Sequence, residues 1–295
     1  MPPSDYRIEP HPSFGFPRVV PTPSAEVIAR FYAEHFYSGE YQRFNNSSLE
    51  AQERDRAFND GHREDICAAL QRCAGRPLEG LRVLDIGCGY AQALEHFRTK
   101  GMICSGFDPA PEAVGHARNQ GLEVSQAGLE RMDVFSGRRF DVVTMFHVLE
   151  HLADPVAVLT EIRDDVIEPG GLLVLEVPND FNALQKAARE LHGLAEWWVA
   201  PPAHLNYFNG ETLSRLLVGC GYRTVHMEAT FPLEVFLLFG DNYVADREVG
   251  RACHARRVAF EQNLRSLGRV DVLRSLYRSL AEQNLGRTVV AIAKA

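Results

Sequence analysis

The chain has 295 residues, 45% of them hydrophobic, and its 39 acidic and 31 basic side chains give a formal net charge of −8. This length suffices for one large domain with a second helical part. The negative charge argues against a nucleic-acid partner, because phosphate contacts need a basic face. No apolar run approaches the ~20 residues of a membrane span, and the first residues lack the apolar core of a signal peptide. The six scattered cysteines are typical of reduced thiols in a cytoplasmic protein.

Residues 1–79 are expected to form an N-terminal arm and a helical cap. The first 23 residues contain seven prolines, which predicts an extended arm that is packed on the surface or partly disordered. Ser24 is a suitable N-cap for a helix that runs to about Tyr37. A second helix is predicted from Ser48 to Cys73.

Strand and helix patterns then alternate along the chain. The predicted strands are 82–86, 103–107, 122–125, 140–145 and 171–177, and the predicted helices are 91–100, 111–119 and 155–166. Such alternation predicts a parallel sheet with right-handed crossovers. A ligand is then expected at the carboxyl ends of the first two strands.

The last third of the chain resumes the sheet after an insertion. Residues 179–203 contain Trp197 and Trp198, which either line an acceptor site or pack on the core. Strands are predicted at 222–228 and 287–294, which makes 80–229 plus 286–295 the core. Residues 230–285 form a helical insertion rich in arginine, expected to be a solvated face, a dimer contact, an acceptor-pocket wall or an anion site.

The most informative segment is a glycine-rich turn after the first core strand. Asp85 ends the strand, Gly87 and Gly89 allow close approach of a ligand to the backbone, and Asp108 follows the next strand. A carboxylate there suits a ribose diol. A dinucleotide fingerprint would need a third small residue at Gln92, and Asp85 would repel a pyrophosphate. The turn therefore predicts a nucleoside cofactor that carries positive charge.

With Ala91 in place of a third glycine, this turn resembles the D/E-x-G-x-G-x-G motif of class I S-adenosylmethionine-dependent methyltransferases. Segments 139–151, 169–178 and 204–208 extend the resemblance to the small-molecule and sugar branch, with its vLEHl and His-x-x-x-Phe motifs. The resemblance implies an α/β fold with a Rossmann-like seven-stranded sheet, whose last two strands are antiparallel. N-terminal helices and the insertion between these two strands are added to that core.

The resemblance also implies cofactor contacts for S-adenosylmethionine and its product S-adenosylhomocysteine. The amino-acid part is expected on the turn and near Asp85, the ribose at Asp108, and the adenine near Phe107. The remaining predicted contacts are Gly128 and Leu129 at the adenine, and Phe146 and His147 at the methionine part. Tyr32, Tyr37 and Tyr41 of the N-terminal helices either pack in the core or close over the cofactor.

His204 is the first candidate for a general base, because an ordinary histidine pKa near 6.5 suits proton removal at neutral pH. Alternatively, His204 only fastens the insertion to the core. His147 is the second candidate. Methyl transfer itself is an in-line displacement that mainly requires alignment of the reacting atoms.

His147 to His151 also fits the H-x-x-E-H pattern of zinc peptidases. We expect no metal there, because the pattern follows a buried strand and Asp154-Pro155 interrupts a helix. Magnesium-dependent catechol methylation is disfavoured because no carboxylate directly follows the fourth strand. The D/N-P-P-Y/F/W motif of nucleic-acid amino methyltransferases is replaced by Phe146-His147.

The sequence thus predicts metal-independent methyl transfer from S-adenosylmethionine to a hydroxyl of a small molecule or sugar. Transfer to carbon of a sugar or polyketide-like acceptor, and methylation of a polysaccharide, are alternatives. An NAD-dependent oxidoreductase or an inactive cofactor-binding scaffold would be a different class. A homodimer is compatible with the pattern, and the sequence does not identify the acceptor.

Overall fold

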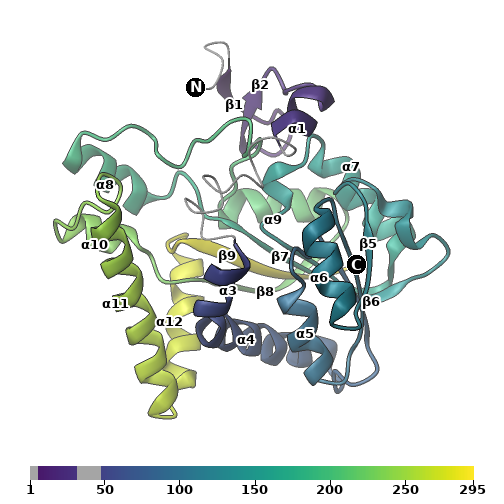
Figure 1. Cartoon of the computed structure of the whole chain (residues 1–295). Coiled ribbons are helices and arrows are strands. Elements are labelled where there is room, and N and C mark those ends of the chain that lie inside the picture. The colour runs from purple at the N-terminus through teal and green to yellow at the C-terminus, as the bar shows by residue number, and fades with distance from the viewer. Residues whose placement is uncertain (1–5, 32–47) are drawn as a thin grey trace.

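The computed structural model describes residues 6–31 and 48–295, and its centre is a seven-stranded sheet of order β5-β4-β3-β6-β7-β9-β8 (Figure 1). The strands are β3 (Arg82–Ile86), β4 (Ile103–Asp108), β5 (Glu123–Gln126), β6 (Phe140–Phe146), β7 (Ile167–Pro178), β8 (Arg223–Ala229) and β9 (Thr288–Lys294). β3 to β7 pair in parallel, whereas β9 is antiparallel to both β7 and β8. The predicted Rossmann-like class I sheet is confirmed.

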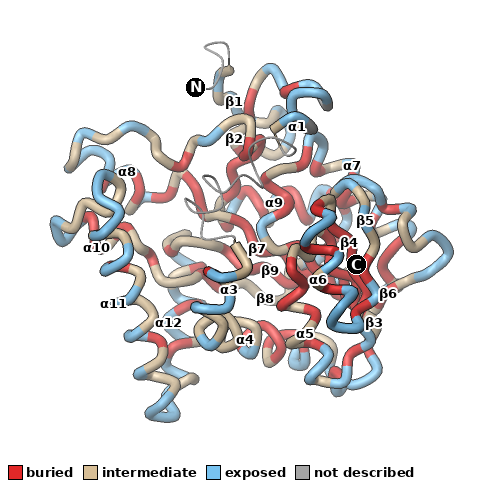
Figure 2. Tube along the Cα trace, viewed as in Figure 1, coloured by how far each residue is buried: buried red, intermediate tan, exposed pale blue. Residues whose placement is uncertain are grey.

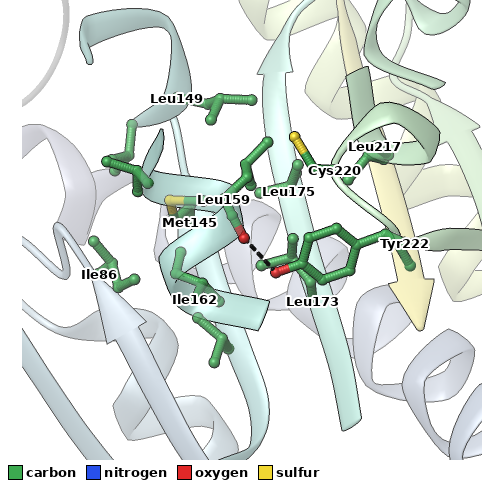
Figure 3. Close-up of a cluster of buried hydrophobic side chains, with 14 of the residues drawn as sticks. Ile86, Met145, Leu149, Leu159, Ile162, Leu173, Leu175, Leu217, Cys220 and Tyr222 are labelled. Carbon is green, nitrogen blue, oxygen red and sulfur yellow. Dashed lines mark hydrogen bonds between the residues drawn. The ribbon is translucent and has the colours of Figure 1, made fainter. Parts of the chain in front are cut away.

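The central strands form because their side chains are mostly apolar on both faces, as in parallel sheets covered by helices. Consecutive residues such as Val83 and Leu84 point to opposite faces of the sheet and belong to separate buried clusters. The buried positions follow the central strands in Figure 2. Figure 3 shows part of one cluster, where the hydroxyl of Tyr222 donates to the carbonyl of Leu159 at 2.9 Å.

Helices cover both faces of the sheet (Figure 1). The cluster on one face includes side chains of α4 (Arg56–Ala74), α5 (Gln92–Thr99) and α6 (Pro111–Asn119). The other cluster includes α7 (Pro155–Glu161) and α9 (Gly210–Gly219). The predicted helix 155–166 is α7 followed by a π-helical segment, Ile162–Val166. This three-layer arrangement leaves the carboxyl ends of the parallel strands at one edge.

The N-terminal arm is more ordered than the sequence indicates. β1 (Arg7–Pro10) and β2 (Pro17–Val20) form an antiparallel hairpin. Phe16 between them is fully buried in the core, because its ring packs on Phe208. An arm lying only on the surface is therefore not what the structure shows.

The predicted N-terminal helices are confirmed in part. Ser24 precedes α1 (Ala25–Phe31), while the rest of that predicted helix and Tyr32, Tyr37 and Tyr41 lie outside the described residues. The second predicted helix is divided at Asp55 into α3 (Leu49–Arg54) and α4.

The insertions are helical. α8 (Ala183–His192) precedes the two tryptophans, and α10 (Glu234–Leu238), α11 (Arg247–Ser266) and α12 (Val270–Glu282) lie between β8 and β9. α12 packs along β8, and α11 lies beside α12 and α4. Asp65 on α4 binds Arg265 and Arg274, so some of the insertion's arginines are internal ion pairs rather than a solvated face. The proposed domain boundaries stay a prediction.

Candidate active site

The turn after β3 has the backbone geometry that its glycines predict. Gly87 and Gly89 have φ angles of +70° and +50°. The N–H groups of Gly87 and Cys88 both donate to the carbonyl of Phe107, at 2.9 and 3.1 Å. A Cβ atom on Gly87 would lie 2.5 Å from Cγ2 of Val148, whereas one on Gly89 would meet nothing within 4 Å. The turn is therefore packed tightly against Val148 at Gly87 and is open at Gly89.

Asp108 organises the same turn. One carboxylate oxygen accepts from the N–H of Gly89 and the other from that of Ala110, both at 2.8 Å. Only 5% of the residue is exposed. Asp108 thus joins the end of β4 to the glycine turn, and its expected contact with a ribose stays a prediction.

Asp85 lies beneath the turn, buried to 2% exposure. It accepts a hydrogen bond from the hydroxyl of Thr144 at 2.7 Å. Burial, with Asp108 nearby, raises the pKa of Asp85 to about 7. A cationic group beside it would favour the ionised carboxylate, whereas a pyrophosphate would oppose it. This donor set therefore fits a cofactor with an ammonium or sulfonium group.

The three predicted adenine contacts have different outcomes. Leu129 lies at the turn, since its Cδ2 would be 3.1 Å from a Cβ on Gly87, and its neighbour Gly128 is exposed. The ring of Phe107, in contrast, has no exposed surface and packs in the core. The prediction that this ring flanks the adenine is therefore wrong for this conformation, and Phe107 acts on the turn through its carbonyl.

His147 follows β6 and lies between two carboxylates. Its backbone has a φ of +56°, and its N–H donates to the carbonyl of Glu176 at 2.8 Å. Its imidazole nitrogens lie 3.4 Å from Glu150 and 3.6 Å from Glu176. Although its side chain is 48% exposed, the two carboxylates raise the pKa of His147 to about 10. The adjacent Phe146 is half-buried and packs near Phe97.

Sequence reasoning did not identify Glu176 or His62 as site residues. His62 on α4 lies 3.2 Å from the second oxygen of Glu176, and this pairing raises its pKa to about 9 despite burial. The two histidines hold the pKa of Glu176 well below its usual value against the effect of burial. No local motif announces this contact, because 114 residues separate the partners.

His204 lies in the loop between α8 and α9. Its Nδ1 atom is buried and has no hydrogen-bond partner among the described residues. Burial, together with His151, lowers the pKa of His204 to about 4. The imidazole is therefore neutral at neutral pH, but it is a weak base.

Glu150, His151 and His204 come together, with one donor atom from each lying within 4.8 Å of the others. The peptidase-like helix does not form, because Leu149–His151 is a single 3-10 turn. The prediction was right about the helix, but it did not foresee that His204 joins Glu150 and His151.

Trp198 packs with Val19 and Tyr207 in a small buried cluster, with Trp197 at its margin. In the described conformation Trp198 therefore supports the N-terminal hairpin. Among the residues that the structure describes, no helix is long and apolar enough to cross a membrane.

Comparisons with known proteins agree with this fold. The family described as "Methyltransferase domain" matches residues 58–227. A ubiquinone biosynthesis O-methyltransferase of Cereibacter sphaeroides is 39% identical over 123 residues, covering 39% of this chain and 49% of that protein. One of Dinoroseobacter shibae is 38% identical over 109 residues, covering 35% and 43%. The chain thus spans about half the length of the curated relatives it matches.

Among solved structures, the plantazolicin methyltransferase BamL aligns with a TM-score of 0.53 and 15% identity, over 91% of this chain and 96% of that chain. This likeness supports the fold. The predicted methyltransferase assignment, with S-adenosylmethionine as the methyl donor, is confirmed at the level of the family. On the match over residues 58–227, the chain belongs to the methyltransferase domain family.

Proposed function

We propose that the protein transfers a methyl group from S-adenosylmethionine to a hydroxyl of a small molecule or sugar. The observation that carries the proposal is the glycine turn with Asp85 beneath it and Asp108 hydrogen-bonded across it. The names of the matched relatives, O-methyltransferases of ubiquinone biosynthesis, support transfer to oxygen. A cytoplasmic location and a homodimer stay predictions.

The cofactor supplies an activated methyl group on a sulfonium, and the chain holds it in place. In our proposal the buried carboxylate of Asp85 attracts the ammonium end. The open side of Gly89 allows the amino-acid part to approach the backbone. Leu129 covers the adenine ring, and Asp108 fixes the turn and faces the ribose.

The acceptor is expected at the carboxyl ends of β6 and β7, beside His147 and Glu176. At neutral pH His147 is protonated, because its pKa is raised to about 10, so it donates hydrogen bonds rather than removing a proton. His204 is unprotonated but has a pKa lowered to about 4. The predicted general base is therefore weak, and proton removal from an alcohol would need further assistance.

Two measurements test the proposal. Thermal unfolding with S-adenosylhomocysteine and with NAD separates the two cofactor classes, and stabilisation by S-adenosylhomocysteine alone is expected. Labelled S-adenosylmethionine is then incubated with hydroxylated ubiquinone precursors, simple sugars and fractionated extract, with Asp108→Ala as the blank. Label in small acceptors supports the proposal. Stabilisation by NAD alone would contradict it.

A further inference from the structure

Two members of the cluster formed by Glu150, His151 and His204 have buried polar atoms without a well-formed hydrogen bond. Glu150 is 1% exposed, and Nδ1 of His147, 3.4 Å from Oε1, is a distant ion-pair neighbour. Neither carboxylate oxygen accepts a well-formed hydrogen bond within the described part of the chain. The Nδ1 atom of His204 is likewise buried and unpartnered there. Buried carboxylates normally have partners, because loss of water is costly. A small cation between these groups would satisfy both.

The three side chains are held in place by backbone contacts. The N–H groups of Leu205 and Asn206 donate to the carbonyl of Glu150 at 2.8 and 3.0 Å. The side-chain amide of Asn206 donates to the carbonyl of Leu152 at 2.8 Å. The loop that carries His204 is therefore fastened directly to the turn that carries Glu150 and His151.

The orientation of His151 is the one that metal-binding histidines have. Its Nδ1 lies 2.6 Å from the carbonyl of Ala203, so Nδ1 carries the proton and donates it. Nε2 then presents its lone pair on the side of Glu150, 4.0 Å from Oε1. A backbone carbonyl that fixes the tautomer in this way is a common outer contact of a metal ligand. The ring of His204 meets that of His151 edge-on, with centroids 5.0 Å apart.

We propose that Glu150, His151 and His204 bind a divalent transition-metal ion of the Zn²⁺ class. Two imidazoles and one carboxylate suit Zn²⁺ better than Mg²⁺, which prefers oxygen ligands. Three protein ligands leave a coordination position for another oxygen, as in catalytic zinc sites. Bonds of about 2.1 Å hold donor atoms roughly 3–3.5 Å apart, so binding draws this cluster slightly closer. The proposal replaces the expectation of no metal at this turn.

An ion here would assist the reaction, a point that rests on the proposed function. The cluster begins two residues after Val148, whose side chain packs against Gly87 of the cofactor turn. An ion bound beside that turn would attract an acceptor hydroxyl and lower its pKa. It would thereby assist loss of the proton from that hydroxyl.

The test measures metal directly and needs no acceptor. Protein is treated with a chelator, loaded with ZnCl₂, desalted and analysed for zinc, with expected retention of about one ion per chain. Glu150→Gln, His151→Gln and His204→Gln should each reduce retention at least tenfold. His96→Gln is the matched control, because His96 lies beside Asp60 and Glu64 outside the cluster. Loading with MgCl₂ should leave no retained ion.

His147→Gln distinguishes the proposed ligands from the H-x-x-E-H pattern of zinc peptidases, in which His147 would be a ligand. Because His147 is not one of the proposed ligands, the His147→Gln variant should retain zinc. Less than about a tenth of an ion on the native chain, or equal retention in Glu150→Gln, would overturn the proposal. Loss of zinc in His147→Gln would overturn the donor set. Co²⁺ loaded into the native chain should give the intense visible bands of a low-coordinate site, and the spectrum of free aqueous Co²⁺ would contradict it. Calorimetry with S-adenosylhomocysteine tests the proposed function separately, because Glu150→Gln should still bind it.

Discussion

The two halves of the site are built in different ways. The cofactor half comes mainly from one continuous stretch, in which a strand, a glycine turn and the next strand place Asp85 at the end of β3 and hydrogen-bond Asp108 to Gly89 of the turn. The acceptor half joins distant segments, such as His62 on α4 with Glu176 on β7. A local motif can therefore announce the first half, whereas the second becomes visible only when the chain is folded.

The largest effect is expected in the cofactor half, from Asp108→Ala. This change removes two charge-assisted hydrogen bonds to the turn, each worth about 1.5–3 kcal/mol, so affinity for S-adenosylhomocysteine should fall on the order of 1000-fold. Calorimetry measures the change. Asp133→Ala, at an exposed carboxylate paired with Arg131, is the matched control and should bind normally. Tight binding by Asp108→Ala would show that the turn does not depend on this carboxylate.

The success of the sequence in the core has a physical basis. Most strands in the segment 82–178 contain a short apolar run, and the turn needs glycine where φ is positive. Each of these signals depends on only a few neighbouring residues, so it can be recognised in a single sequence. The prediction that β8 and β9 pair in antiparallel fashion came from the family resemblance. The sequence pattern alone does not show this pairing, because the helical insertion separates the two strands.

The parts that sequence reasoning missed depend on long-range packing. A strand pattern places Phe107 next to Asp108 but does not tell which of the two faces the core. The ordinary pKa of a histidine made His204 a good candidate base, yet burial lowers that pKa to about 4. The gathering of Glu150, His151 and His204 requires the loop at 203–206 to meet the turn at 149–152.

Paired glycine substitutions sharpen the comparison within the cofactor half. Gly87→Ala should lower the free energy of unfolding by about 2–4 kcal/mol. Alanine is strained in the left-handed backbone conformation of this position, and its Cβ would also collide with the side chain of Val148. Gly89→Ala has open space and should cost only about 1 kcal/mol. Denaturant unfolding measures both. Gly89→Ala should nevertheless weaken cofactor binding, since its Cβ points where we place the ligand; equal stability losses would count against the packing argument.

Asp65→Asn tests the contact between the helical insertion and α4, the helix that carries His62 of the acceptor half. Asp65 is buried beneath Arg265 and Arg274, so its loss leaves two partly buried cations without their carboxylate. The free energy of unfolding should fall by about 2–3 kcal/mol, with cofactor affinity unchanged. Glu248→Gln, in an exposed pair with Arg251, is the control and should cost almost nothing. A fall in cofactor affinity in Asp65→Asn would show that the packing of the insertion on α4 also affects the cofactor half.

A further effect in the cofactor half is a pH dependence that belongs to Asp85. Its folded pKa, raised to about 7 by burial, exceeds the unfolded value of about 3.9. The native state therefore binds more protons between these values, and stability contributed by this group falls as pH rises from about 4 to about 7. A bound ammonium group favours the ionised carboxylate instead. Affinity for S-adenosylhomocysteine should then rise up to about tenfold per pH unit below pH 7 and level off above it.

Calorimetry across pH 5.5 to 8 measures this rise, and Asp85→Asn should abolish it. Thr144→Val provides a finer test, because it removes the hydroxyl that stabilises the ionised form of Asp85. Without this hydrogen bond the pKa of Asp85 should increase further, so the pH at which affinity levels off should move upward. A native profile that is flat over this range would mean that Asp85 does not meet the ammonium end, and the cofactor half would then rely on Asp108 and the glycine turn.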